Sequence, residues 1–182
     1  TKQQIPTDAG LRFNGDIIEF CTEHLPRWVP VSIAGYNGAD TGLTPDQELG
    51  SLFANAVEYL DEIKLRGRIP LEVAARGCGG VSFRASIKIF EEACKMRAAR
   101  LMWSDLLKQR YGINDERVAN LRIHCVTAGS KMAYQQPMNN LVRGALMAVS
   151  AVLGGVQSLG VSGYDEALSI PSEHAHQMSV RI

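Results

Sequence analysis

The chain has 182 residues, 46% of them hydrophobic, and its 19 basic residues balance 19 acidic ones. This length suits one globular domain with a substantial core. The lack of net charge gives no long-range attraction to nucleic acid or to an anionic membrane. No apolar run approaches the ~18 residues of a membrane-spanning helix, and residues 1–10 lack the apolar segment of a secretory signal. We therefore predict one cytoplasmic domain that binds neither nucleic acid nor a membrane.

The cysteines and histidines indicate no metal site and no disulfide framework. The four cysteines form no Cys-x-x-Cys pair, which is typical of reduced thiols. His174 and His176 are two residues apart, so they fall on different faces of a helix.

The first half of the chain alternates between helical and extended patterns. Residues 16–25 predict a short amphipathic helix, and residues 30–34 a strand. Thr44 is a good helix N-cap, because Pro45 follows it and Gln47 completes a capping box. Apolar residues at helical spacing continue to Gly67, which can end the helix in the left-handed conformation. Residues 71–76, LEVAAR, predict the next strand.

The second half repeats the alternation. A long helix is predicted over residues 86–111, with one apolar face made of Ile87, Phe90, Cys94, Ala98 and Leu101. Residues 121–126 predict a third strand, Pro137 opens a helix that ends at residues 154–155, and residues 156–161 predict a fourth strand. A last helix begins near Pro171. On their helix faces, Cys21 and Cys94 are expected to be core residues.

Strands that alternate with helices of these lengths indicate an α/β fold with parallel strands and right-handed crossovers. Four strand–helix units make half of a (β/α)8 TIM-type barrel, or a small open sheet. An incomplete barrel exposes strand edges, so we expect an oligomer or a partner that covers them.

Several stretches resemble the substrate-barrel domain of the methylmalonyl-CoA mutase family. They are EFCTEHLPRWVPVSIAGYN with a following QEL, FEEACKMRAARLMW, PMNNLVRGALMAVSAVLGGVQSL, and DEAL before a proline. The likeness runs from about Asp16 to Pro171 in the family's order. It implies that residues 1–182 form a single partial barrel domain, the later half of a (β/α)8 barrel. The family's cobalamin domain, marked by D-x-H-x-x-G, is absent from this sequence.

The resemblance implies radical chemistry on a CoA thioester. In such enzymes the substrate lies along the barrel axis, and adenosylcobalamin is held by a separate domain or small subunit. The cofactor supplies the difficult chemistry, while the protein positions the substrate and excludes water. The expected partners are therefore an acyl-CoA and a cobalamin-binding small subunit or domain.

Asn37 is the residue that the resemblance assigns to catalysis. It stands where the family usually has the histidine of Gly-Tyr-His, which touches the migrating thioester carbonyl. Asparagine offers a neutral and shorter donor, so weaker polarisation of that carbonyl is expected. The alternative is that Asn37 only caps a loop turn.

Three residues are assigned to the CoA arm by the same resemblance. Arg27 matches a lysine that pairs with a CoA phosphate, and arginine keeps that charge. Arg76 matches an arginine at a strand end. Gly77-Cys78 replaces the family's Leu-Ser, and the Cys78 thiol is expected at the mouth of the site.

The cofactor side carries six assigned residues. Asp40 occupies the place of a glutamate that faces the corrin, and Glu166 can accept hydrogen bonds from ribose hydroxyls. The full set is Asp40, Val126, Ser158, Ser162, Glu166 and Ala167. His124 also matches the pattern, with a buried, hydrogen-bonded core histidine as the alternative interpretation.

Three functions follow. The first is the large-subunit segment of an adenosylcobalamin-dependent acyl-CoA mutase that acts on a methylmalonyl-CoA-like or branched acyl-CoA. The second is a non-catalytic acyl-CoA-binding or scaffold module derived from such a barrel. The third is an unrelated α/β barrel enzyme acting on a small phosphorylated metabolite.

Overall fold

Four parallel strands form one sheet in the part of the chain that the computed structural model describes, residues 5–182. The strands are β1 (Ile33–Ala34), β2 (Gly80–Ala85), β3 (Arg122–Thr127) and β4 (Ser158–Gly160). Their order in the sheet is β1-β2-β3-β4, and every neighbouring pair is parallel. The prediction of an α/β fold with four parallel strands alternating with helices is confirmed.

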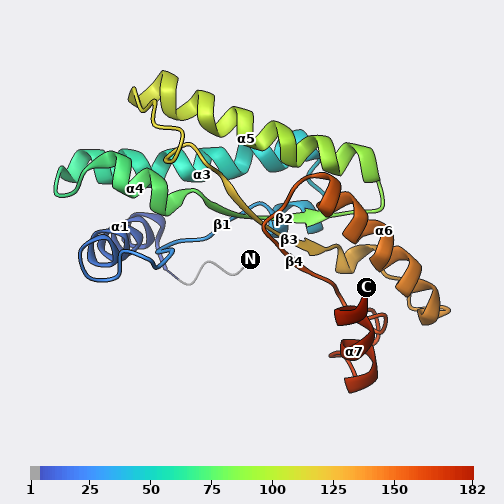
Figure 1. Ribbon diagram of the computed structural model, residues 1–182. Helices are drawn as coiled ribbons and strands as arrows, with labels where there is room; N and C mark the ends of the chain where they lie inside the picture. The colour runs from blue at the N-terminus through green and yellow to red at the C-terminus, as the bar shows by residue number, and fades with distance from the viewer. Residues whose placement is uncertain (1–4) are drawn as a thin grey trace.

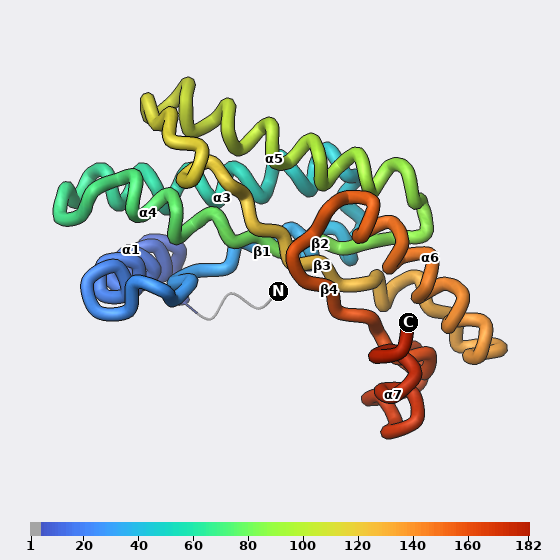
Figure 2. The backbone as a smooth tube through the Cα atoms, viewed as in Figure 1, coloured from blue at the N-terminus to red at the C-terminus, as the bar shows by residue number. Residues whose placement is uncertain are grey.

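Helices surround this sheet on one face and at its ends (Figure 1). They are α1 (Thr7–His24), α2 (Tyr36–Asp40), α3 (Pro45–Arg66), α4 (Leu71–Cys78), α5 (Ile89–Tyr111), α6 (Asn140–Leu153) and α7 (Glu173–Arg181), with short 3₁₀ turns η1 (Gly129–Lys131) and η2 (Pro137–Asn139). Helices α3 and α5 run side by side over the sheet, and α1 and α7 lie on opposite sides of it (Figure 2). Among residues 5–182, no helix has the length and apolarity needed to cross a membrane.

The two faces of the sheet differ in burial. In β2, Val81, Phe83 and Ala85 are buried under the helices, while alternate residues point to the other, more open face. In β3, Ile123 and Cys125 are buried in the same way. Because the strand order never reverses, the crossovers can all lie on one side. This order is compatible with part of a (β/α) barrel, whereas a doubly wound sheet needs a reversal of the strand order.

The predicted helix signals in α3 and α5 are found in place. The Thr44 N–H donates to Oε1 of Gln47 at 3.1 Å in the expected capping box. Gly67 ends α3 in the left-handed conformation with φ 63°, and Gly112 ends α5 with φ 71°.

The prediction of a strand over residues 71–76 is wrong, because this segment is the helix α4. Ala74, Ala75 and Cys78 are buried at helical spacing, and α4 packs against α1 and α3. The segment's apolar residues are too few to distinguish period two from period 3.6. The strand instead begins at Gly80, so Arg76 lies in the last turn of a helix rather than at a strand end.

The predicted buried face of α5 is also wrong. Phe90 is 81% exposed, Leu101 is 70% exposed, and Cys94 is exposed. The helix buries a different face, which includes Met96, Trp103, Leu107 and two charged residues, Glu92 and Lys95. The two buried charges form an ion pair. A hydropathy pattern treats charged residues as solvent-facing, so it assigns this buried face to the surface.

Candidate active site

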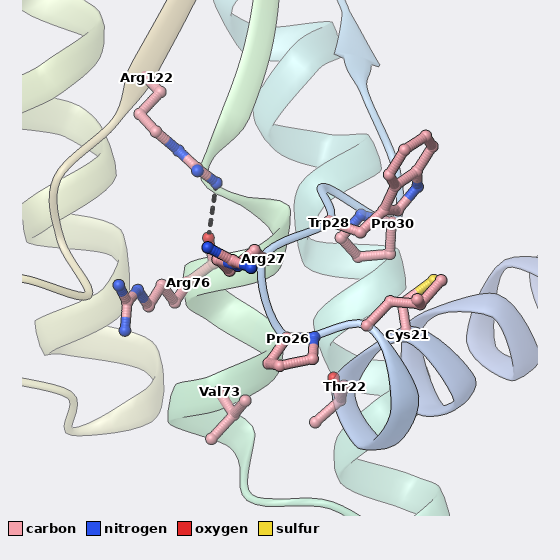
Figure 3. A pocket seen from close by; sticks show the side chains of 11 residues that line it. Cys21, Thr22, Pro26, Arg27, Trp28, Pro30, Val73, Arg76 and Arg122 are labelled. Carbon is pink, nitrogen blue, oxygen red and sulfur yellow. Dashed lines mark hydrogen bonds between the residues drawn. The ribbon is translucent and has the colours of Figure 1, made fainter.

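A cavity of about 390 Å³ lies at the amino ends of the strands and brings three arginines together. Arg27 follows α1, Arg76 comes from the last turn of α4, and Arg122 is the first residue of β3. Nη2 of Arg122 donates to the carbonyl of Arg76 at 3.1 Å, as Figure 3 shows. The structure therefore joins the two arginines predicted for CoA and adds a third that the sequence analysis missed.

The charges of these three arginines are available to a ligand. All three side chains belong to exposed residues, and none makes a salt bridge with a carboxylate in the described chain. The exposed indole of Trp28 belongs to the wall of the same cavity, on the far side of Pro30 from the arginines (Figure 3). Clustered guanidinium groups bind phosphates bidentately, and an aromatic ring elsewhere in the cavity wall can stack on a flat base. The cavity is thus suited to a phosphorylated, partly aromatic ligand.

Cys78 does not lie at this mouth, which corrects the prediction from the sequence. Its side chain is fully buried in the core, and burial raises the pKa of its thiol to about 12. The neighbouring Gly77 lines the cavity instead. The error follows from the misplaced strand, because a helix ending at Cys78 turns this thiol inward.

A second cavity of about 310 Å³ continues from Arg122 onto the open face of the sheet. It is lined by the polar residues Ser32, His124, Gln157 and Ser158 together with apolar neighbours. Nδ1 of His124 lies 2.7 Å from the hydroxyl oxygen of Ser158, one strand away. His124 is exposed, so the interpretation as a buried core histidine is wrong. Ser158 belongs to this groove.

A cluster of charged residues occupies the opposite, carboxyl ends of the strands. The carboxylate of Asp40, at the end of α2, accepts a hydrogen bond from the hydroxyl of Ser130 at 2.8 Å. Nη1 of Arg84 in β2 lies 3.5 Å from the same carboxylate. Glu166 packs over Gly129, where an added Cβ would come within 3.3 Å of its Oε1. Asp40 and Glu166 therefore flank the same loop, η1.

The pKa of Tyr36 responds to the charges of both carboxylates in this cluster, Asp40 and Glu166. Burial, followed by the charge of Asp40 and a hydrogen bond to it, raises the pKa of the Tyr36 phenol to about 12, and Glu166 adds to the shift. The phenol therefore stays protonated as a donor throughout the physiological range. Tyr36 was not singled out from the sequence, although it precedes Asn37.

The remaining predicted residues take different positions. Val126 pairs with Arg84 and with Gly160 in register, on the open face near the carboxyl ends. The Ser162 N–H donates to Oγ1 of Thr127 at 2.8 Å, and its hydroxyl donates to the Thr127 carbonyl, so Ser162 fixes the end of β3. Ala167 is exposed next to Glu166.

Asn37 lies in α2, directly after β1, and is exposed. No hydrogen bond joins its side chain to another residue of the described chain, and the turn after α2 is capped by the hydroxyl of Thr41, which donates to the Gly38 carbonyl at 2.9 Å. The interpretation of Asn37 as a turn cap is therefore wrong.

The fold and these sites define a class: a parallel α/β domain with an arginine-lined cavity at one end of its strands, a polar groove along them, and a carboxylate cluster at the other end. The family model described as methylmalonyl-CoA mutase matches residues 2–182. The chain therefore belongs to the methylmalonyl-CoA mutase family.

Relatives of known name agree with this family. The 2-hydroxyisobutanoyl-CoA mutase large subunit of Aquincola tertiaricarbonis is 38% identical over 176 residues, which are 97% of this chain and 31% of that relative. The methylmalonyl-CoA mutase of Rhizobium meliloti is 35% identical over 96% of this chain and 24% of its own length. The human mitochondrial methylmalonyl-CoA mutase is 34% identical over 92% of the chain and 22% of its own length. The chain thus spans less than a third of each of these relatives.

Proposed function

We propose that this chain is the substrate-barrel segment of an adenosylcobalamin-dependent acyl-CoA mutase, the later half of a (β/α)8 barrel. The observation that carries the proposal is the order of these sites along the strands, which we call the substrate path. The arginine cavity and the groove of His124 and Ser158 share Arg122, and the cluster of Asp40 and Glu166 lies at the opposite ends of the strands. A long CoA thioester has its phosphates at one end and its reacting acyl group at the other. The path offers matching chemistry in that order.

Each part of the path has a defined task in this proposal. Arg27, Arg76 and Arg122 bind the CoA phosphates, and the polar groove accommodates the amide-containing arm. Asn37 donates a hydrogen bond to the thioester carbonyl. A methylmalonyl-CoA-like or branched acyl group would lie near Asn37, at the carboxyl ends of the strands.

The family's cofactor fits the chemistry of this end. Adenosylcobalamin, when bound, supplies the radical that starts the rearrangement. Glu166, exposed beside Ala167, offers a carboxylate to ribose hydroxyls, and Asp40 offers a second acceptor fixed by Ser130. Val126, on the open face near the same ends of the strands, supplies an apolar surface. The cofactor itself would be held mainly by a small subunit or another domain, since one relative is named as a large subunit.

The open edges of the sheet favour a larger assembly. Strands β1 and β4 form its edges, and α6 leaves Val142 and Val152 exposed. We propose that the rest of the barrel or a partner subunit covers these surfaces.

The first test is a calorimetric titration of the chain with CoA. Arg27→Ala and Arg76→Ala should each weaken binding by about tenfold or more, since a charge-assisted hydrogen bond is worth about 1.5–3 kcal/mol. Arg117→Ala is the matched control, because Arg117 is exposed and paired with Asp115 at 3.1 Å outside the cavity. Equal affinities in all four proteins would contradict the assigned CoA site.

The second candidate function is a non-catalytic acyl-CoA-binding module. The exposed Asn37, which replaces the family's histidine, favours it. Glu166→Gln in the enzyme assembled with its cobalamin partner separates the two. A catalyst should lose turnover and keep its CoA affinity, whereas a binding module has no turnover to lose.

A further inference from the structure

Arg84 lies on the open face of β2, and the proposed function assigns no role to it. It lies one residue before the carboxyl end of the strand and pairs in register with Val126 of β3. Its side chain is only 11% exposed. A mostly buried arginine in the charged cluster at the carboxyl ends of the strands requires a partner, since an unpaired guanidinium is costly to desolvate.

The guanidinium of Arg84 is satisfied on one side only. Nη1 donates to the Ala39 carbonyl and lies 3.5 Å from Oδ1 of Asp40. Nε is buried and has no hydrogen-bond partner. The side-chain hydrogen bonds that Arg84 donates within the described chain both come from Nη1, so Nη2 donates none there. Because Nε–H and Nη2–H are parallel, they form the side-on edge with which arginine binds oxygen pairs.

The backbone of Arg84 is held rigidly from the helix side. Nζ of Lys95 donates to the Arg84 carbonyl at 2.9 Å, and the Arg84 N–H donates to Oε1 of Glu48 at 3.4 Å. Lys95 and Glu48 are themselves a buried ion pair. These contacts fix the backbone, and the Nη1 contacts to Ala39 and Asp40 fix the guanidinium. A donor held at both ends loses little freedom when a ligand binds, which is the requirement for a selective polar contact.

We propose that the Nε/Nη2 edge of Arg84 binds oxygen atoms of the acyl group, and that Arg84 therefore selects acyl-CoA substrates that carry a carboxylate or a hydroxyl. This inference rests on the proposed function and names the substrate class of that site. Asp40 shares the positive charge of Arg84, so both an anionic and a neutral oxygen group are compatible with the edge. An all-hydrocarbon branched acyl group leaves the buried Nε unpaired and is disfavoured.

The test is a comparison of three CoA thioesters of similar size by titration of the chain. Methylmalonyl-CoA carries a carboxylate, 2-hydroxyisobutanoyl-CoA carries a hydroxyl, and isobutanoyl-CoA carries neither. The native chain should prefer at least one oxygenated thioester over isobutanoyl-CoA by about 10- to 100-fold. Arg84→Met should reduce that preference to about one while leaving the affinity for free CoA unchanged.

Two further variants keep the test decisive. Arg100→Met removes another partly buried arginine, which donates to the Gly154 and Gly155 carbonyls away from the site, and should leave the preference intact. Arg84→Lys keeps the charge without the side-on edge, and it replaces Arg84→Met if the latter fails to fold. An intermediate preference is expected for it.

Each outcome has a separate meaning. A preference for the carboxylate or for the hydroxyl identifies which oxygen group the edge binds. CoA binding with an unchanged acyl preference in both Arg84 variants would overturn this inference alone. No binding of CoA or of any thioester to the native chain would overturn the proposed function, and this inference with it.

Discussion

Lys95 and Glu48 meet in the core with Nζ and Oε2 2.6 Å apart, and both side chains are only 1% exposed. Glu92 lies at the same distance of 2.6 Å from Nζ on the other side. The ammonium also donates to the Arg84 carbonyl and lies over the ring of Phe83, 5.3 Å from its centroid. One cation thus joins α3, α5 and β2 beneath the carboxyl end of the sheet.

Lys95→Met should lower the free energy of unfolding by about 3–5 kcal/mol, because it leaves the carboxylates of Glu48 and Glu92 buried without a cation. Urea denaturation measures this change. The control is Lys88→Met, since Lys88 pairs with Glu91 at 2.9 Å but is 70% exposed, and the expected loss is about 0–1 kcal/mol.

The Lys95→Met penalty should also depend on pH. Burial already raises the pKa of Glu48, with Lys95 opposing the shift, so loss of the lysine raises that pKa further. A raised carboxyl pKa contributes stability at low pH that is lost as the pH rises through the folded value. The penalty should therefore be smaller in acid than at neutral pH. A penalty that grows in acid would contradict this assignment.

Sequence patterns predicted the elements whose local chemistry and tertiary packing agree. The capping box at Thr44 and the left-handed Gly67 fix α3 by short-range interactions alone. The strand predicted over residues 121–126 is also found, as β3. The patterns failed where tertiary contacts decide. In α4, two turns of helix are buried mainly through alanines, and in α5 the buried face includes the Glu92–Lys95 pair.

The candidate site also contains residues that the sequence indicates and residues that only the structure shows. Arg27 and Arg76 were found through the family likeness, and the structure lines one cavity with both. Arg122 lay within a correctly predicted strand, so alternation of faces could have placed it beside His124. The sequence patterns do not point to Arg84, because they predict the second strand at residues 71–76 and the next helix from residue 86, so β2 falls in the predicted loop between them. An error in one strand therefore removed one functional candidate and misplaced Cys78.

The four free cysteines should react unequally with a thiol reagent at pH 8. Cys94 is exposed, whereas Cys21, Cys78 and Cys125 are buried. Burial raises the pKa of both Cys78 and Cys125 to about 12, so neither forms the reactive thiolate. We expect one fast-reacting thiol in the native chain, lost in Cys94→Ser and retained in Cys21→Ser. Rapid labelling of a second thiol would contradict the burial of these side chains.

The buried Cys78 thiol also predicts a loss of stability in alkali. Its pKa rises from an ordinary value of 9.0 to about 12 in the folded chain. Between these values the unfolded chain releases a proton that the folded chain retains, so the stability falls as the pH rises. Unfolding measured from pH 8 to pH 11 should show this slope, and Cys78→Ala should be less steep. The same slope in both proteins would mean that the thiol ionises freely when folded.

Arg122→Gln should weaken CoA binding by about tenfold or more and reduce its dependence on salt. The substitution removes one of three charges in the cavity together with the hydrogen bond to the Arg76 carbonyl. Titrations at low and high ionic strength measure both effects. Arg117→Gln removes an exposed arginine outside the cavity and should change neither. A variant of Arg122 with native affinity and salt dependence would restrict the phosphate site to Arg27 and Arg76.

Asn37→His should leave the fold intact and raise turnover in the enzyme assembled with its cobalamin partner. Asn37 is exposed and its side chain has no partner in the described chain, so the free energy of unfolding should change by no more than about 0.5 kcal/mol. The imidazolium extends further and donates a charge-assisted hydrogen bond, which stabilises charge that develops on the thioester carbonyl. Steady-state kinetics should show the gain in kcat, with KM nearly unchanged.

Asn37→Gln separates reach from charge in this experiment, because it moves the same neutral amide outward by one methylene. If charge is the missing element, the histidine variant gains turnover and the glutamine variant does not. If reach is missing, both gain. A histidine variant with native or lower turnover would show that the surroundings of Asn37 are adapted to an amide, and that the acyl group differs from those for which the family uses histidine.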